Sequence, residues 1–259
     1  MTERREAVRL RGIRRTYRLL LISDVHFSIL TSQHQNLAVT QEILRRLHGR
    51  IDAVCVTGDL VSRKPGKTGI PDALRLMQEL GRYARVVYSL GNHETDMPPE
   101  ARKAWIRRIK RIGVTVLDNT SCHVGELRLT GLTLPGDVYR HEDGSFKDLR
   151  RITPGLVRRC AGKAEDHQIL LAHNPLGLPA YAAWGAQLVL SGHVHGGVIR
   201  VPVLGGLLSP ERTFFPRYTK GLYEMHGCRM EVSAGIGKLR FANPPEIVYV
   251  KILPEHSRS

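Results

Sequence analysis

Three apolar runs in the first half of the chain each end in a short polar group that contains an acid, an amide or a histidine. These runs and the groups that follow them cover residues 19–22 and 23–26, residues 51–57 and 58–59, and residues 84–90 and 91–94. Between them, residues 35–48 and 71–80 have the apolar spacing of helices. Alternating strands and helices predict a parallel α/β sheet, and such sheets bind ligands at the carboxyl ends of their strands.

The two helices within this pattern have clear expected boundaries. In the first, Leu37, Ile43, Leu44 and Leu47 should form the buried side, and Gly49 should end the helix. The second should begin at Pro71, after a loop over residues 65–69, because proline favours the first helical position.

The remaining segments predict further strands and two more helices. Residues 8–11 predict an edge strand whose arginines face solvent. Residues 99–112 predict a helix that buries Ala101, Trp105, Ile109 and Ile112. The other expected elements are strands at 114–117, 127–130, 168–172, 187–190, 198–204, 230–233 and 247–252, a helix at 152–160, a helical turn at 180–184 and an irregular stretch at 135–148. The second half is richer in hairpin-like strands, and without a linker or repeat we expect residues 1–259 to form a single domain.

The composition restricts the partners and the compartment. A net charge of +15, from 39 basic and 24 acidic residues, favours anionic partners: a phosphate-bearing substrate, nucleic acid or an acidic membrane surface. A basic surface kept for solubility explains that charge equally well. The four cysteines form no C-x-x-C pair, and the basic start of the chain lacks the apolar region of a signal peptide. We therefore expect a cytoplasmic protein, with peripheral contact at the inner face of the membrane as an alternative.

The polar groups at the strand ends contain the side chains that bind metal ions. They are Asp24, His26, Asp59, Asn92, His93, His173, His193 and His195. Oxygen and nitrogen donors without thiolates suit manganese, iron, zinc or magnesium. There are too many donors for one tetrahedral ion, and a carboxylate such as that of Asp59 can bridge two. Two ions about 3.5–4 Å apart are the usual apparatus for in-line displacement at phosphorus.

Each donor also has a structural explanation. Asp24 and Asp59 could cap a following turn, His173 could be a core residue, and Asn92 could occupy a turn with positive φ. Five strand ends would all have to carry such residues by chance, which favours the metal site. His193 and His195 are one residue apart, so on an extended turn they would point the same way and reach adjacent cations. Glycines on both sides would let the backbone approach those cations.

In this order and context, the residues resemble the blocks of the calcineurin-like metallophosphoesterases, which read D-x-H, G-D, G-N-H-E/D, a single H and G-H-x-H. Here the blocks are residues 24–26, 58–59 and 91–94, His173 and residues 192–195. The resemblance implies an α/β fold, a two-sheet mixed β-sandwich flanked by helices in four αββα layers.

The resemblance also implies the roles of the donors. One divalent ion would bind Asp24, His26, Asp59 and His195, and a second would bind Asp59, Asn92, His173 and His193. Manganese is the first choice for both, with iron, zinc or magnesium as alternatives. His93 would be the catalytic residue that faces the phosphate, and in protonated form it would stabilise the developing charge and protonate the leaving oxygen. Glu94 would either orient an imidazole or begin a helix.

The implied activity is hydrolysis of a phosphodiester or pyrophosphate bond by in-line attack of a metal-bridging hydroxide. Further stretches resemble a bacterial branch of membrane-associated phosphodiesterases that includes UDP-diacylglucosamine pyrophosphatases, namely residues 196–202, 220–223, 235–237 and 245–247. Many members carry an anchor or export signal before D-x-H, where this chain has a short basic segment. The expected substrate is a phosphate ester, lipid-linked or nucleotide-linked.

Other functions remain open at this point. A phosphomonoesterase or protein phosphatase would use the same donors. A nuclease ranks lower, because the basic residues show little of the aromatic interleaving of single-strand binders. A non-catalytic scaffold would be expected to lack a ligand or His93, and all of them are present. We expect the loops at residues 63–69, 135–148 and 204–217 to determine specificity.

Overall fold

The chain forms two six-stranded sheets in a computed structural model, which describes residues 1–28, 31–63, 66–141, 145, 149–197, 199–201, 205–208, 217–237 and 243–255. The first sheet contains, in spatial order, β1 (Thr2–Leu10), β14 (Glu246–Pro254), β2 (Tyr17–Ile22), β3 (Ala53–Thr57), β4 (Val86–Ser89) and β5 (Thr115–Leu117). The second contains β12 (Gly221–Met225), β13 (Cys228–Val232), β9 (Leu188–Ser191), β8 (Gln168–Ala172), β7 (Leu127–Leu132) and β6 (Ser121–Val124). A small sheet pairs β10 (Ile199–Val201) with β11 (Gly205–Leu208).

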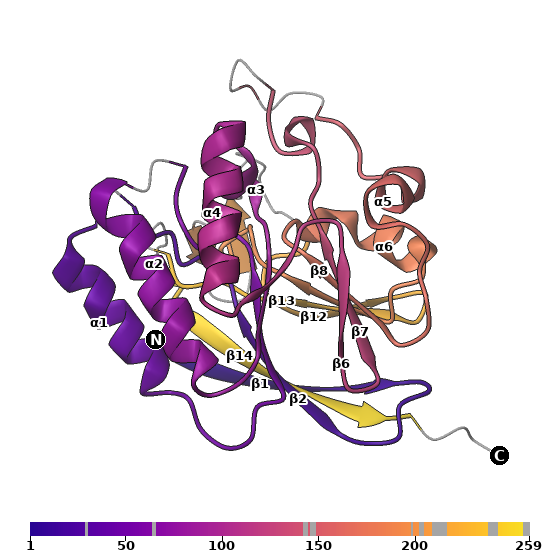
Figure 1. The fold of residues 1–259 in the computed structure, drawn as a ribbon. Coiled ribbons are helices and arrows are strands. Elements are labelled where there is room, and N and C mark those ends of the chain that lie inside the picture. Colours follow the sequence, from indigo (N-terminus) through magenta and orange to yellow (C-terminus); the bar gives the residue numbers. More distant parts are fainter. Residues whose placement is uncertain are drawn as a thin grey trace.

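Helices cover the outer face of each large sheet. Three of them pack on the first sheet: α1 (Gln33–Leu44), α2 (Gly66–Gly81) and α4 (Pro99–Arg111). Two pack on the second: α5 (Pro154–Ala161) and α6 (Leu178–Trp184). Figure 1 shows the two groups on opposite sides of the molecule, with the sheets between them. The expected sandwich of two mixed sheets flanked by helices is confirmed.

Alternation along the strands produces three separate apolar layers. In β2, Leu19 and Leu21 face the second sheet, whereas Leu20 and Ile22 face the helices. All four side chains are fully buried. Burying a leucine side chain stabilises a fold by about 1.5–3 kcal/mol, and a strand buried on both faces has a nearly continuous apolar sequence. The unbroken apolar run at residues 19–22 thus corresponds to a strand at the centre of the sandwich.

The first helix differs from its prediction in both length and buried face. It ends at Leu44, before the expected end at residue 48, and Leu37 is 36% exposed. Asn36 and Thr40 are buried instead, and the Asn36 side-chain amide donates a hydrogen bond to Asp72 on α2 at 2.7 Å. Ser32 starts the helix with a capping box. A polar contact between helices, which the apolar pattern does not contain, therefore sets the orientation of α1.

Two other predicted segments also require correction. The helix expected to begin at Pro71 already begins at Gly66, so Pro71 lies inside α2 and most of the predicted loop at 65–69 is helical. A proline inside a helix costs one backbone hydrogen bond, which this helix tolerates. Ala101, expected in the buried stripe of α4, is exposed, while Trp105 and Ile109 are buried as predicted.

The strands β6 and β12 were not predicted, and each forms an antiparallel hairpin with the strand that follows it. No helix in the described ranges is long and apolar enough to cross a membrane. The four cysteines are free thiols in this structure.

Candidate metal centre

The predicted metal-binding residues meet at one edge of the sandwich. They follow the carboxyl ends of β2, β3, β4, β8 and β9, which run parallel within their sheets. His173 joins the two sheets, because its Nδ1 lies 2.8 Å from the carbonyl oxygen of Thr57. The rule that ligands gather at strand carboxyl ends therefore applies to both sheets at once.

The backbone turns sharply at five of these residues. Asp24, His26, Asp59, His193 and His195 all have φ between 50° and 72°, in the left-handed region. Aspartate and histidine enter this region more readily than most residues. The extended turn expected around His193 and His195 is therefore wrong. Two left-handed residues separated by the buried Val194 direct the imidazoles instead.

Neighbouring backbone groups hold Asp24 in its unusual conformation. Its carbonyl oxygen accepts hydrogen bonds from the N–H groups of Ile236 at 3.1 Å and Gly237 at 2.6 Å, and its carboxylate accepts one from His193 N–H at 2.9 Å. A Cβ atom on Gly235 would lie 2.6 Å from the Asp24 Cβ atom, so only glycine fits there. The turn at residues 234–237 thus fixes the backbone of Asp24 through its carbonyl oxygen.

One group of donors, which we call the inner set, consists of Asp59, Asn92, His173 and His193. Its donor atoms surround His173 Nε2: Asn92 Oδ1 lies at 3.1 Å, His193 Nδ1 at 3.2 Å and Asp59 Oδ2 at 3.3 Å. Since His173 Nδ1 contacts a carbonyl oxygen, the neutral form of this ring keeps its proton on that nitrogen and leaves the Nε2 lone pair for a metal ion. The inner set could therefore hold one divalent ion.

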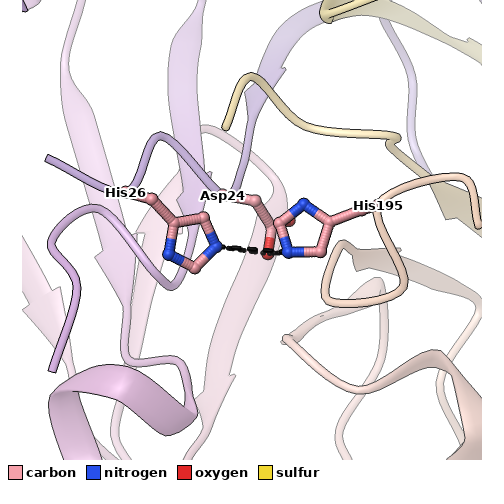
Figure 2. A group of neighbouring side chains, drawn as sticks. All are labelled: Asp24, His26 and His195. Atoms are coloured by element: carbon pink, nitrogen blue, oxygen red, sulfur yellow. Dashed lines mark hydrogen bonds and ion pairs between the residues drawn. The ribbon is translucent and has the colours of Figure 1, made fainter. Parts of the chain in front are cut away.

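A second group, the outer set, consists of Asp24, His26, His195 and, again, Asp59. His26 Nε2 lies 3.2 Å from His195 Nε2 and 3.7 Å from Asp24 Oδ1 (Figure 2). It also lies 3.7 Å from Asp59 Oδ2. Asp59 Oδ2 thus belongs to both sets. Because the donors are all hard oxygens and imidazoles, the two sets fit a pair of divalent cations that share one carboxylate.

The electrostatics of the buried acids agree with a positively charged occupant. Burial opposes ionisation of Asp24, but His195 and His173 hold its pKa well below the usual range. The pKa of Asp59 is likewise lowered, because His173 and His93 outweigh burial. Burial favours the neutral form of His173, but Asp59 and Asp24 raise its pKa to about 10. These carboxylates are therefore ionised and attract positive charge.

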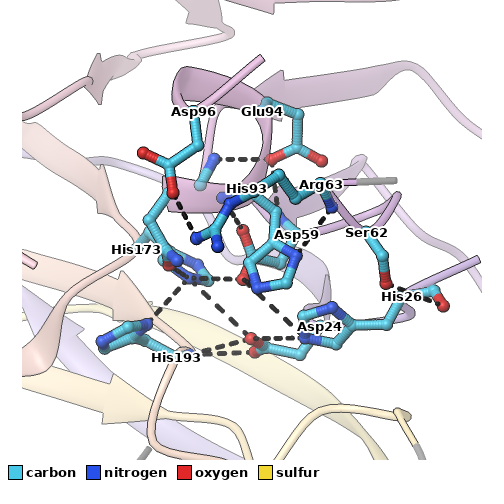
Figure 3. Close-up of polar contacts among 12 residues, drawn as sticks. Asp24, His26, Asp59, Ser62, Arg63, His93, Glu94, Asp96, His173 and His193 are labelled. Atoms are coloured by element: carbon cyan, nitrogen blue, oxygen red, sulfur yellow. Dashed lines mark hydrogen bonds and ion pairs between the residues drawn. The ribbon is translucent and has the colours of Figure 1, made fainter. Parts of the chain in front are cut away.

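His93 lies beside the shared carboxylate, where its ring nitrogen groups with the donor atoms of His26 and Asp59. Its Nε2 is 3.8 Å from Asp59 Oδ2, and its Nδ1 accepts a hydrogen bond from Arg63 N–H at 3.0 Å (Figure 3). Burial, helped by His26 and Arg63, lowers the pKa of His93. A neutral imidazole in this arrangement carries its proton on Nε2, and the protonated form that the resemblance implies stays a prediction.

Glu94 supports the centre through the backbone. Its carboxylate accepts hydrogen bonds from the N–H groups of Gly91 at 2.9 Å, Asp59 at 2.9 Å and Val61 at 3.2 Å. Burial and Asp59 raise its pKa to about 7. Of the two expected roles, the helix start is observed, because the bond to Gly91 caps α3 (Asn92–Thr95). Glu94 also fixes the turn that presents Asp59.

The rim of the site contains residues that the sequence did not single out. The guanidinium groups of Arg63 and Arg140 both contact the Asp96 carboxylate, Arg140 at 3.4 Å. The Tyr139 ring lies edge-on to His193, with centroids 5.1 Å apart. Arg63, Tyr139 and Arg140 lie within the predicted specificity loops, but nothing in the spacing of those loops indicated which residues reach the site. Residues 64–65, 142–144, 146–148, 204 and 209–216 of these loops lie outside the described residues, as do residues 198 and 202–203 of the strand expected at 198–204.

A buried group of charged residues holds the turn at residues 234–237, which contacts Asp24. Glu246, which is 1% exposed, accepts a hydrogen bond from Ala234 N–H at 2.8 Å and lies 2.5 Å from the Lys220 amine. Arg4 contacts both Glu246 and Glu231. Glu246 thus ties the turn at residues 234–237 to both sheets. No periodic pattern marks this residue, because its partners are distant in sequence.

Comparisons with known proteins agree with this geometry. Residues 17–197 match the sequence model of the family described as calcineurin-like phosphoesterase. An uncharacterized metallophosphoesterase of Helicobacter pylori is 28% identical over 245 residues, which cover 92% of this chain and 60% of that protein. Phosphodiesterase YaeI of Escherichia coli is 24% identical over 246 residues, which cover 92% of this chain and 82% of that protein. This chain therefore spans about 60% of the length of its Helicobacter relative.

Among solved structures, the sulfate thiohydrolase SoxB of Thermus thermophilus matches with a TM-score of 0.45 and 14% identity, over 85% of this chain and 52% of that one. The family match covers well over half of the chain and includes every residue of both donor sets. The chain therefore belongs to the calcineurin-like phosphoesterase family, whose members depend on metal ions to hydrolyse phosphate esters.

Proposed function

We propose that this protein hydrolyses a phosphodiester or pyrophosphate bond at a pair of divalent metal ions. The observation that carries the proposal is the convergence of two donor sets on a single oxygen, Asp59 Oδ2. A shared carboxylate suits a pair of ions better than one ion. The phosphodiesterase name of the Escherichia coli relative supports the choice of a diester over a monoester.

The proposed ligands of one ion are Asp24, His26, Asp59 and His195, and those of the other are Asp59, Asn92, His173 and His193. Manganese is the first choice, with iron, zinc or magnesium as alternatives. Two such ions would supply a water nucleophile at neutral pH and stabilise charge on the phosphate oxygens. His173 would bind its ion through Nε2, because the Thr57 carbonyl oxygen keeps the proton of the neutral ring on Nδ1.

His93 would act as a hydrogen-bond donor and acid from Nε2. Its Nδ1 accepts the Arg63 N–H, so the proton on Nε2 points toward the shared carboxylate, where the phosphate would lie. The neutral ring would donate a hydrogen bond from Nε2 to the phosphate. When water adds to phosphorus and the bond to the leaving oxygen breaks, the proton released by the water would convert His93 to the imidazolium, which protonates the leaving oxygen and returns to the neutral form.

Arg63 and Arg140 would bind the part of the substrate that projects from the centre. Both are about one-third exposed, and both contact the Asp96 carboxylate. Planar guanidinium groups suit phosphate oxygens, which agrees with a lipid-linked or nucleotide-linked phosphate ester. The narrower resemblance to UDP-diacylglucosamine pyrophosphatases, the cytoplasmic location and a membrane contact stay predictions. We also propose that residues 1–259 act as one domain, which the shared apolar layer between the sheets supports.

Metal analysis and a pair of substrates test the proposal. Protein loaded with manganese and dialysed should retain two ions per chain, measured by plasma mass spectrometry. It should turn over bis(p-nitrophenyl) phosphate faster than p-nitrophenyl phosphate. Retention of one ion or none would contradict the paired centre, and preference for the monoester would favour a phosphomonoesterase.

A further inference from the structure

A second charged site lies at the opposite end of the first sheet. A surface pocket of about 350 Å³ is lined by Arg5 and Ala7 of β1, Arg18 of β2, Tyr249 and Lys251 of β14, and the segment from His48 to Arg50 that follows α1. We call it the basic pocket. Arg18 stands near the start of β2, six residues before Asp24, which corresponds to about 20 Å along an extended strand. The pocket is therefore separate from the metal centre.

Two cations in this pocket lie directly opposite each other. Strands β14 and β2 are antiparallel, and their register pairs Lys251 with Arg18. Both side chains are exposed, and each points outward from the apolar layer between the sheets. Like charges directly opposite on one face of a sheet destabilise it, because their Cβ atoms are only about 4.5–5.5 Å apart. An anion between them would turn this repulsion into attraction.

The acids around the pocket are engaged by other basic groups. Glu3 contacts Arg5 at 2.7 Å and His48 at 2.9 Å, and Asp52 contacts Arg50 at 3.4 Å. Glu6, the one acid that lines the pocket, contacts Arg4 at 2.8 Å. Within the described ranges, neither the Arg18 nor the Lys251 side chain forms an ion pair with an acid. These two cations are thus the unneutralised pair of the pocket.

A fixed aromatic platform borders the pair. The Tyr249 ring stacks on His48 with centroids 4.7 Å apart. The Tyr249 hydroxyl donates to Arg46 O at 2.9 Å and accepts from His48 N–H at 3.1 Å, which holds both rings in place. Tyr249 also lies two residues before Lys251, on the same face of β14. The pocket therefore combines free positive charge with a rigid wall, so little side-chain entropy would be lost on binding a ligand there.

We propose that the basic pocket binds the phosphate group of an anionic ligand, with Arg18 and Lys251 as its principal contacts. Arg5, Arg50 and His48 surround these two and raise the local positive potential. The ligand chemistry is a phosphate monoester or diester, carried by a soluble molecule or by a lipid headgroup. This site is independent of the proposed hydrolysis.

Calorimetric titration of the metal-loaded protein with inorganic phosphate tests the proposal. The variant Arg18→Gln/Lys251→Gln should bind one phosphate fewer per chain than the wild type, and each single variant should bind about tenfold more weakly at that site. The matched control Arg107→Gln/Lys110→Gln removes the same charge from the exposed face of α4 and should bind as the wild type does. All variants should retain the wild-type kcat for a diester.

Co-sedimentation with vesicles of phosphatidylcholine and phosphatidylglycerol identifies the source of the phosphate. If the double variant loses vesicle binding and the control does not, the ligand is a lipid headgroup. If both bind vesicles as the wild type does while the phosphate site is lost, the ligand is soluble. Equal phosphate stoichiometry in the wild type and the double variant would overturn the proposal. A denaturation midpoint at or above that of the wild type would show that the double variant is folded.

Discussion

The two donor sets use the same kinds of side chain but are held differently. His173 of the inner set is fully buried and is fixed by a backbone carbonyl oxygen from the other sheet. His26 of the outer set has a side chain that is 16% exposed and stacks on His195. The inner set is therefore anchored in the packing between the sheets through His173, whereas His26 of the outer set lies on a left-handed turn and is partly exposed to solvent. We therefore expect the inner set to contribute to the stability of the fold, and the outer set to affect mainly how readily its metal ion exchanges.

Removing the shared carboxylate should have the largest effect. Asp59→Asn removes the one negative oxygen that both sets use, so both ions should be lost. Since the ions provide several kcal/mol of charge stabilisation, kcat/KM should fall by roughly 10⁴-fold. Metal content and diesterase turnover measure this. Full metal occupancy in this variant would mean that Asp59 does not join the two sets.

Substituting one histidine from each set compares them directly. His173→Asn and His26→Asn should each lose one ion and most activity, by roughly 10³-fold. Only His173→Asn should also lower the free energy of unfolding of the metal-free protein, by about 1–3 kcal/mol, because it removes the buried hydrogen bond between His173 Nδ1 and the Thr57 carbonyl oxygen and leaves that oxygen with Ser23 Oγ as its side-chain partner. Urea denaturation in EDTA measures the free energy of unfolding of each variant without metal and so distinguishes His173→Asn from His26→Asn. Equal destabilisation would remove the distinction between inner and outer sets.

His93→Asn should affect turnover without affecting either set. Both ions should remain bound, while kcat should fall by roughly 10²-fold, the lower end for loss of general acid catalysis. The loss should be smaller for substrates with a p-nitrophenolate leaving group, which needs little protonation. An equal loss for good and poor leaving groups would argue that His93 only binds the phosphate.

The pH dependence of the metal-free protein should give the smallest effect. Because the folded-state pKa of His173 is raised from 6.5 to about 10, its contribution to stability is complete below pH 6.5 and is lost as the pH rises toward 10. In EDTA, the free energy of unfolding should therefore fall over this range, and less so in His173→Asn. With manganese the trend should weaken, because a bound cation requires neutral histidine. A stability that rises with pH in EDTA would contradict the assigned shift.

The sequence predicted the parts of the molecule that depend on local pattern. Strands at the centre of the sandwich, such as residues 19–22, have apolar side chains on both faces and were found. The metal-binding side chains were predicted because each of them directly follows an apolar run that could be recognised as a strand. The face of α1 was missed, since a single hydrogen bond from Asn36 to another helix decides it.

Long-range contacts account for most of what the sequence did not predict. Strand β1 begins at Thr2, although only residues 8–11 were expected, because its polar first half pairs with β14 at the other end of the chain. The tautomer of neutral His93 depends on the backbone N–H of Arg63, 30 residues earlier in the chain. Glu246 reaches Asp24 only through the turn at residues 234–237. None of these relations has a spacing that could be recognised in advance.

The left-handed backbone at the donors has a practical consequence for the choice of substitutions. Five of the eight non-glycine residues with positive φ in the described ranges are candidate ligands. At such positions asparagine and glycine are tolerated, whereas alanine and especially β-branched residues add strain of their own. In an alanine scan of this centre, the measured effect of each substitution would therefore combine the loss of a ligand with a change in the conformation of the turn. Asparagine replacements keep the shape of the chain, so they report the chemistry of each ligand separately from its fold.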